Sequence, residues 1–213
     1  MKRIRAYLLF TSWRYRLGIF LGLPAAVLAG GLFWHYYIMS SGFGFLVMVV
    51  AMIIFAETMT DQGIFNGIQS KRGYKLDLLK TSHVGQRILF YGLSGDLARR
   101  LLTVAVCIGA GWAAKVLAVG KGWAGCLGVV LAVYFAEVLG LFISRFTQSV
   151  ILCLFTAYGG IAIGVILYIL VSSISAPGLW VVDGLLALAA AAMSVLIVWT
   201  GMKRWLQTYS DMQ

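Results

Sequence analysis

Six long apolar stretches dominate this sequence, and most of the charged residues lie between them. The stretches cover residues 17–38, 43–59, 101–119, 122–143, 147–171 and 179–202. A helix that crosses a bilayer needs about 20 mainly apolar residues, and none of the stretches shows the polar–apolar alternation of a membrane strand. With 62% hydrophobic and 11% charged residues, a water-soluble fold of this length could not bury the apolar surface. We therefore predict an all-α integral membrane protein with six transmembrane helices in a single domain, residues 1–213.

The distribution of lysine and arginine predicts the orientation of this domain. If the amino terminus is cytoplasmic, fifteen of the 17 basic residues fall in cytoplasmic segments, and only Lys115 and Lys121 lie outside. Cytoplasmic loops of membrane proteins carry such an excess of basic residues. We expect both termini in the cytoplasm. The net charge of +10 is explained in the same way, so nucleic acid is not expected as a partner.

The first sixteen residues mix basic side chains with apolar and aromatic ones. The basic and aromatic residues that would anchor this segment are Arg3, Arg5, Trp13, Arg14 and Arg16. Such a pattern suits a helix that lies in the plane of the lipid head groups. A plain cytoplasmic extension of the first span is the alternative.

The longest segment between spans, residues 60–100, is expected to be a cytoplasmic loop that carries a short amphipathic helix. Long loops in compact domains are usually functional or disordered, and this one is not low in apolar residues. Leu76 and Leu79 stand three residues apart, on one face of a helix, between Gly73 and Gly85. We expect this helix to lie on the membrane surface, where a soluble partner can reach it.

Residues for catalysis or metal binding are scarce. The two histidines, His35 and His83, are expected on opposite sides of the membrane, and the cysteines have no metal-site spacing. Ser94 lies in a Gly-Leu-Ser-Gly sequence, but no histidine follows it to act as a base. The segment from Asp96 to Arg99 lacks the further acids that a metal-dependent lipid transferase needs, and no phosphate-binding loop is present. We therefore expect no catalytic residues, no metal ion and no cofactor in this chain.

Two acidic residues are candidates for a cavity or a coupling site. Glu137 lies inside the fourth apolar stretch, where a carboxyl group is costly and should face a cavity or a partner. A hydrogen bond to a neighbouring helix, or a protonated acid, is the structural alternative for Glu137. Glu57 lies at the cytoplasmic end of the second stretch, and a salt bridge to the basic loop is the favoured interpretation.

The arrangement of these elements resembles the membrane subunit of type-2 ABC transporters, the exporter-like permease class. The shared features are six spans, a basic amphipathic start, short outer loops and one cytoplasmic segment with a short helix, Lys71 to Ser82. The resemblance implies that this coupling helix docks on a separate ATPase subunit, which holds ATP and magnesium. The implied docking residues are Tyr74, Lys75, Leu76, Asp77, Leu79, Lys80 and His83.

The resemblance also implies a second membrane subunit, identical or related, and a substrate path along the seam between the two. A peptide, a lipid-like molecule or another amphipathic compound would be exported across the inner membrane of a bacterium. Abundant glycine in the spans is consistent with closely packed helices or a dimer seam.

Three other functions are compatible with the sequence. The first is the substrate-binding membrane subunit of an energy-coupling-factor vitamin importer, which has a similar length but needs no long cytoplasmic loop. The second is a membrane-embedded enzyme that modifies lipid, against which the lack of clustered acids, histidines and nucleophiles argues. The third is a regulatory or immunity protein without a transport cycle.

Overall fold

The described part of the chain is entirely helical. The computed structural model describes residues 17–38, 42–69, 83–117, 122–146, 150–174 and 176–210. A short π-helical segment, η1 (Gly18–Gly22), runs directly into α3 (Leu23–Tyr37). The helices that follow are α4 (Gly42–Gln69), α6 (His83–Ala113), α7 (Gly122–Phe146), α8 (Val150–Ser173) and α9 (Ala176–Ser210).

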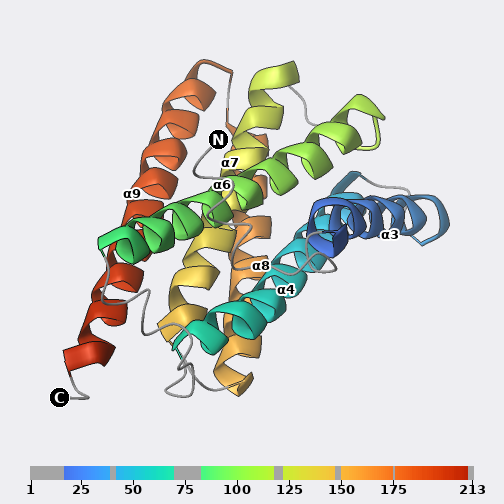
Figure 1. The fold of residues 1–213 in the computed structure, drawn as a ribbon. Helices are drawn as coiled ribbons and strands as arrows, with labels where there is room; N and C mark the ends of the chain where they lie inside the picture. The colour runs from blue at the N-terminus through green and yellow to red at the C-terminus, as the bar shows by residue number, and fades with distance from the viewer. Residues whose placement is uncertain are drawn as a thin grey trace.

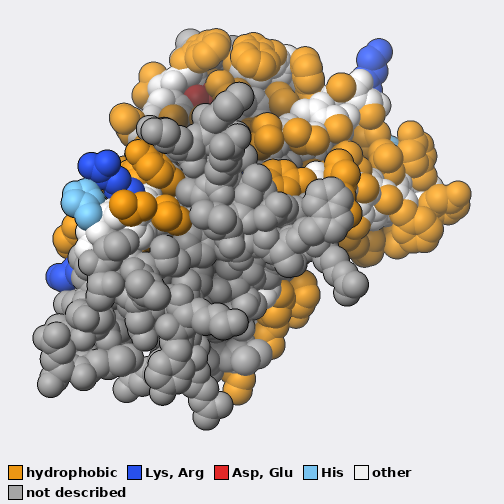
Figure 2. Space-filling view, in the orientation of Figure 1, with side chains coloured by type: hydrophobic (Ala, Val, Ile, Leu, Met, Phe, Trp, Pro, Cys, Tyr) orange, Lys and Arg blue, Asp and Glu red, His pale blue; other side chains and the backbone are white. Residues whose placement is uncertain are grey.

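Five segments within these helices are long and apolar enough to cross a bilayer, which is the pattern of a multi-pass membrane protein. They are Gly18–Tyr37, Gly42–Met59, Gly122–Ile143, Leu154–Ser173 and Gly178–Lys203. Five of the six predicted spans are therefore confirmed in position. Figure 2 shows hydrophobic side chains over most of the described surface on the visible face, as lipid contact requires.

The predicted third span, residues 101–119, is not among these segments. The helix that contains it, α6, begins eighteen residues earlier at His83 and ends at Ala113. Every stretch of 18 residues in α6 includes Asp96, Arg99 and Arg100, so its apolar part is too short to qualify. The sequence predicts a loop for the charged half and a separate helix for the apolar half, whereas the two halves form one helix.

The cytoplasmic loop predicted at 60–100 is also much shorter in the structure. Helix α4 continues to Gln69 and α6 starts at His83, so only residues 70–82 connect the two helices. Gly85, expected to follow the docking helix, is instead buried in the first turn of α6. The docking residues from Tyr74 to Lys80 and the interfacial segment 1–16 lie outside the described residues.

The helices form a bundle in which α6 crosses the others obliquely (Figure 1). Helices α7, α8 and α9 run side by side, and α7 packs against both of its neighbours. Helices α3 and α4 form a second pair, with α3 at the edge of the molecule. Close packing of this pair depends on small residues, because a Cβ atom on Gly31 would lie 2.8 Å from the ring of Phe45.

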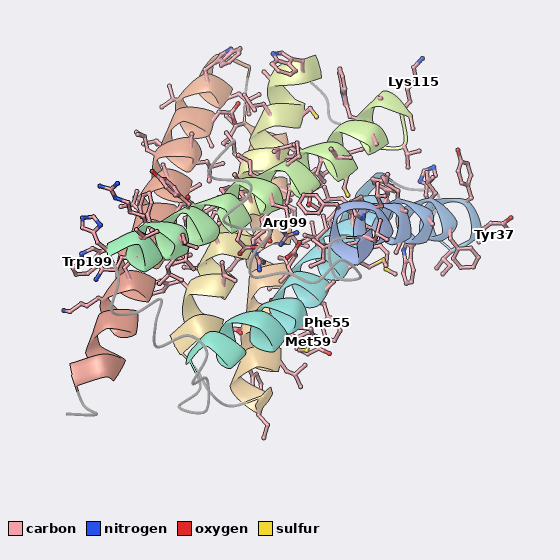
Figure 3. The ribbon with its side chains drawn as sticks, in the orientation of Figure 1. Tyr37, Phe55, Met59, Arg99, Lys115 and Trp199 are labelled. Atoms are coloured by element: carbon pink, nitrogen blue, oxygen red, sulfur yellow. The ribbon has the colours of Figure 1, made fainter. Side chains whose placement is uncertain are left out.

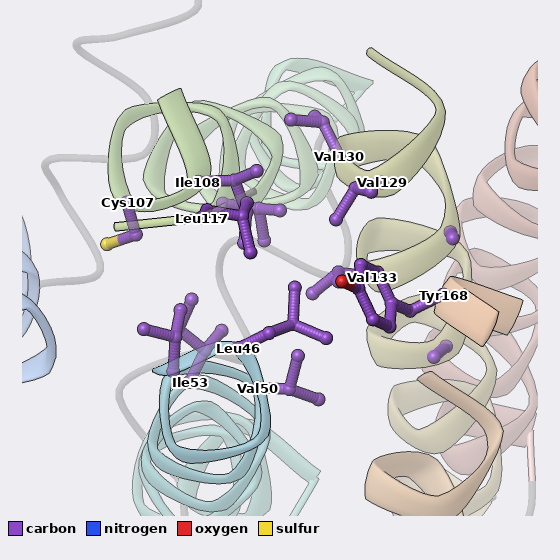
Figure 4. Close-up of a cluster of buried hydrophobic side chains, with 14 of the residues drawn as sticks. Leu46, Val50, Ile53, Cys107, Ile108, Leu117, Val129, Val130, Val133 and Tyr168 are labelled. Carbon is purple, nitrogen blue, oxygen red and sulfur yellow. The ribbon is translucent and has the colours of Figure 1, made fainter. Parts of the chain in front are cut away.

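A large apolar cluster lies where α4, α6 and α7 meet (Figure 4). Leu46, Val50 and Ile53 of α4 face Cys107 and Ile108 of α6. The cluster continues to Val129, Val130 and Val133 of α7 and to Tyr168 of α8. These contacts fix the half of α6 that follows Arg100 against the rest of the bundle.

The end of α6 is defined by a left-handed residue. Lys115 has a φ of 56°, and the backbone N–H groups of Val116 and Leu117 both donate to the carbonyl oxygen of Gly111 at 3.1 Å. This geometry satisfies the last carbonyl groups of a helix and turns the chain away from its axis. Leu117 then folds back into the apolar cluster. The turn explains why the helix does not continue to residue 119.

Candidate functional site: a buried ion network

Five charged side chains meet inside the bundle, and none of them is more than 4% exposed. They come from three helices: Glu57 from α4, Asp96, Arg99 and Arg100 from α6, and Glu137 from α7. Figure 3 places Arg99 near the middle of the molecule, in the region where α4, α6 and α7 overlap. We call these five residues the ion network.

Arg99 binds Glu57 with both ends of its guanidinium group. Its Nη1 and Nη2 atoms donate to Oε1 and Oε2 of Glu57, each at 2.6 Å. Nη2 also donates to Oδ1 of Asp96 at 3.2 Å. A two-point contact between a planar guanidinium and a carboxylate is strong and directional, so it fixes α6 against α4.

Arg100 joins all three acids. Its Nε atom donates to Asp96 Oδ2 at 3.0 Å, and its Nη1 atom lies 3.0 Å from Glu137 Oε1 and 3.1 Å from Glu57 Oε2. Within the ion network, the link to Glu137 connects α6 to α7. Arg100 is therefore the residue through which the three helices are joined electrostatically.

The spacing on α6 produces this arrangement. Asp96 stands three residues before Arg99 and four before Arg100, so one carboxylate faces both guanidinium groups across one helical turn. Asp96 thereby orients the two arginines toward α4 and α7. Without it, two long flexible cations would have to be held by the other helices alone.

The charges of the ion network do not balance. Three carboxylates face two guanidinium groups, which leaves one formal negative charge when all five are ionised. Two polar atoms in the ion network, Nε of Arg99 and Oε2 of Glu137, are buried without a hydrogen-bond partner. Glu137 is thus held by one oxygen only.

The ion network lies close to one end of the apolar segments. Glu57 stands two residues before the end of Gly42–Met59, and Glu137 stands six residues before the end of Gly122–Ile143. At 1.5 Å per residue these offsets are about 3 and 9 Å. Ionised groups at such positions are expensive, and in membrane proteins they usually mark a pathway, a relay or a coupling element. The ion network can hold three helices in one register, and a shift of α6 requires its contacts to exchange together.

The structure brings together two residues that the sequence analysis named separately. Glu57 and Glu137, the candidate cavity or coupling acids, both bind Arg100. The partners of Glu57 lie within residues 60–100, as expected, but on the buried face of a helix rather than in a loop. His83 is exposed at the start of α6, sixteen residues and about 24 Å of helix from Arg99.

The arginines of the ion network were missed by the sequence analysis, which counted both among the cytoplasmic charges. The signal that could have found them is the order Asp96, Arg99, Arg100, with apolar residues on both sides. Acids and bases at a spacing of three and four residues form ion pairs on one face of a helix. Such a group between apolar segments is more consistent with a buried face than with a loop.

A further buried acid lies elsewhere in the bundle. Asp183 on α9 is 4% exposed, and neither of its carboxylate oxygens has a hydrogen-bond partner. It fits against α7 because Gly128 has no side chain: a Cβ atom there would lie 2.5 Å from Oδ1 of Asp183. Among the described residues, no three His, Cys, Asp or Glu side chains are grouped as a metal site.

Comparisons with known proteins give no family for this chain. No protein-family model matches the sequence, and neither the curated proteins nor the solved structures contain a significant match.

Proposed function

We propose that this protein is the membrane subunit of an ATP-driven transporter of the type-2 ABC class. In this proposal the protein lies in the inner membrane of a bacterium. Its chain has six spans, and both termini are in the cytoplasm. A separate ATPase subunit supplies ATP hydrolysis, and a second membrane subunit, identical or related, completes the path of a peptide, lipid-like or other amphipathic substrate.

The observation that carries the proposal is the position of the ion network relative to residues 70–82. Helices α4 and α6, which contribute Glu57, Arg99 and Arg100, are the two helices that this segment connects. About 18 Å of α4 separates Glu57 from Gln69, and about 24 Å of α6 separates His83 from Arg99. A partner that moves residues 70–82 therefore acts directly on the helices that meet in the ion network.

Basic residues near the last three helices support the six-span topology. If α6 stayed on the cytoplasmic side, α7, α8 and α9 would be inverted, and Arg145, Lys203 and Arg204 would face outward. With α6 as an oblique sixth span, all three stay in the cytoplasm, as the positive-inside rule favours. The charges of α6 do not oppose this topology, because Asp96, Arg99 and Arg100 point into the bundle rather than into lipid.

The ion network offers a means of coupling in the proposed cycle. Alternating access requires rigid helices that pass between a few discrete arrangements. When ATP closes the partner, residues 70–82 pull on α4 and α6. The ion network passes that movement to α7 through Arg100 and Glu137, because the buried charges must stay paired.

Recovery of the partner tests the docking segment. The full chain is purified in detergent from its native membrane, and soluble proteins that stay bound are identified. We expect an ATPase with a phosphate-binding loop in the wild type and its loss from a Leu76→Asp/Leu79→Asp variant, because two carboxylates destroy the apolar face. A Leu76→Ile/Leu79→Ile variant is the matched control and should keep the partner.

The coupling role is tested on the recovered complex. Arg99→Lys keeps the positive charge but replaces the two-point contact with Glu57 by a point charge. We expect the variant to keep its ATPase partner while the ATP hydrolysis rate of the complex falls toward that of the free ATPase. An unchanged rate would leave the ion network without a coupling role. A chain that purifies alone with a bound small molecule would instead favour the vitamin-importer subunit.

A further inference from the structure

An apolar groove of about 530 Å³ lies between α6 and α9, on the outer surface of the bundle. Phe90, Ser94 and Leu97 form its α6 side, and Val195, Trp199 and Met202 belong to its α9 side. Phe90, Val195 and Trp199 are exposed, so the groove is open along its length to the surroundings of the bundle. Its size is within the range of sites that bind one small ligand.

The two walls of the groove run in opposite directions. At one end, the hydroxyl of Tyr134 contacts both the carbonyl oxygen of Leu97 at 3.4 Å and the hydroxyl of Ser194 at 3.2 Å. Toward the other end, Leu93 lies against Gly201, where a Cβ atom would be 3.2 Å from Cδ1 of Leu93. Residues that come earlier on α6 therefore lie beside residues that come later on α9.

This register places two basic residues at the same end of the groove. Arg87 is one helical turn before Phe90 on α6, and Lys203 follows Met202 on α9. Both are exposed. The ammonium group of Lys203 lies 5.4 Å from the ring centre of Trp199, which places this charge at the wall of the groove. Figure 2 shows basic side chains spread along the left edge of the molecule, with a histidine between them, where α6 begins beside α9.

This end of the groove coincides with an end of the apolar part of α9. The bilayer-crossing segment Gly178–Lys203 finishes at the same lysine. If α9 crosses the bilayer over this segment, its apolar wall lies at the depth of the acyl chains and Lys203 lies at the level of the head groups. The register described above brings Arg87 toward the same end. Lysine and arginine at this level attract anionic lipids.

From this geometry we infer that the groove between α6 and α9 binds an anionic phospholipid of the surrounding membrane. An acyl chain occupies the space between Phe90 and Trp199, and the phosphate group is held between Arg87 and Lys203. The apolar walls explain why the ligand is a lipid, and the paired cations explain why its head group is anionic. The inference is independent of the proposed transport function, because no contact with an ATPase enters it.

Trp199 provides a local probe for a test on the full chain in vesicles. In vesicles of brominated phosphatidylglycerol and plain phosphatidylcholine, the brominated lipid quenches the tryptophans that it contacts. In vesicles of plain phosphatidylglycerol and brominated phosphatidylcholine, the quenching reports contact with phosphatidylcholine instead. The contribution of Trp199 is the difference between wild type and Trp199→Phe. We expect at least about five-fold tighter binding of phosphatidylglycerol at Trp199, because one basic side chain near the membrane surface contributes a factor of about five.

Two sets of variants assign this preference to the groove. Arg87→Gln/Lys203→Gln should bring the ratio of phosphatidylglycerol to phosphatidylcholine affinity at Trp199 close to one, whereas Lys115→Gln should leave this ratio unchanged. Lys115 is also an exposed cation and lies at the far end of α6 (Figure 3). Ser94→Leu fills the groove and should reduce quenching of Trp199 by both lipids, with gel filtration showing that the variant is folded.

Two outcomes would overturn the inference. A wild-type preference near one means that the groove accepts any neighbouring lipid. A preference that survives Arg87→Gln/Lys203→Gln means that other basic segments attract the anionic lipid to the protein as a whole.

Discussion

Helices α4, α6 and α7 meet twice, and the two meeting places have opposite chemistry. In the apolar cluster, Ile53 of α4, Ile108 of α6 and Val133 of α7 belong to one set of buried apolar side chains. In the ion network, the same three helices are joined through Arg99 and Arg100. The change from one to the other takes about one turn of α4, from Ile53 to Glu57.

The two contacts resist different movements. Dispersion contacts between apolar side chains are weak individually and hardly directional, so helices can slide a little before the packing is lost. The contacts of Arg99 and Arg100 have fixed donors and acceptors within 3.2 Å, and a partial shift leaves charges buried without partners. The apolar cluster holds the helices together, and the ion network determines their register.

The largest expected effect comes from Arg100, which contacts all three acids of the ion network. Arg100→Gln leaves three carboxylates beside one guanidinium group in a buried site. Removing one partner of a buried ion pair typically costs about 3–5 kcal/mol. We expect the variant to be recovered unfolded, or with a strongly lowered melting temperature in detergent. The measurement is loss of the monodisperse gel-filtration peak on heating.

Arg87→Gln is the matched control for this change. Arg87 lies on the same helix but is exposed, so its loss should alter the free energy of unfolding by less than about 0.5 kcal/mol. If Arg100→Gln melted with the control, the ion network would have no part in fixing the fold.

A smaller effect is expected in the apolar cluster. Ile53 is fully buried, and Ile53→Ala removes its larger side chain without leaving a charge. Such truncations cost about 2–5 kcal/mol in soluble cores. In a membrane the lower end applies, because lipid is as apolar as the protein interior and only packing is lost. We expect a loss of about 2 kcal/mol, measured by unfolding in mixed micelles.

Leu188→Ala on α9 is the control that separates the loss of interior packing from the mere loss of apolar side-chain atoms. Leu188 is 70% exposed on the outside of the bundle, and its truncation should change stability little. An equal loss at both positions would contradict the view that Ile53 contributes through interior packing.

The fold was predictable where the sequence is uniformly apolar. Length and hydropathy alone located five of the spans. Lipid offers no hydrogen-bond partners, so an apolar segment that spans it must pair its own backbone N–H and C=O groups and is therefore a helix. The error concerned α6, in which polar and apolar halves are continuous. Hydropathy assigns Asp96, Arg99 and Arg100 to water, but their partners Glu57 and Glu137 are far apart in sequence and only the tertiary fold brings them together.

The candidate site was predictable in part for the same reason. A buried acid in an apolar stretch is conspicuous by its cost, so Glu137 could be named from sequence. Two arginines beside an acid look like ordinary cytoplasmic charges until their burial is known. The groove between α6 and α9 was beyond prediction, because its walls come from helices whose register depends on Tyr134, Leu93 and Gly201.

The smallest expected effect tests whether all members of the ion network are equivalent. Glu137 uses only Oε1, which accepts from Arg100, while Oε2 is buried without a partner. Glu137→Gln keeps an oxygen that can accept from Arg100 and removes the excess negative charge. We expect the stability in detergent to change by less than about 1 kcal/mol, or to rise, because a neutral amide costs less to bury than an unpaired charge.

Glu57→Gln supplies the contrast that makes this prediction sharp. Glu57 accepts from both nitrogens of Arg99, and a glutamine would turn one of its acceptors into a donor that faces a donor. We expect a loss of about 3 kcal/mol, several times that of Glu137→Gln. Equal losses of stability would mean that Glu137 contributes as much as Glu57 to fixing the register of the three helices. A larger loss at Glu137 would mean that the negative charge itself is needed, and that the link from α6 to α7, rather than the one from α6 to α4, holds the three helices in place.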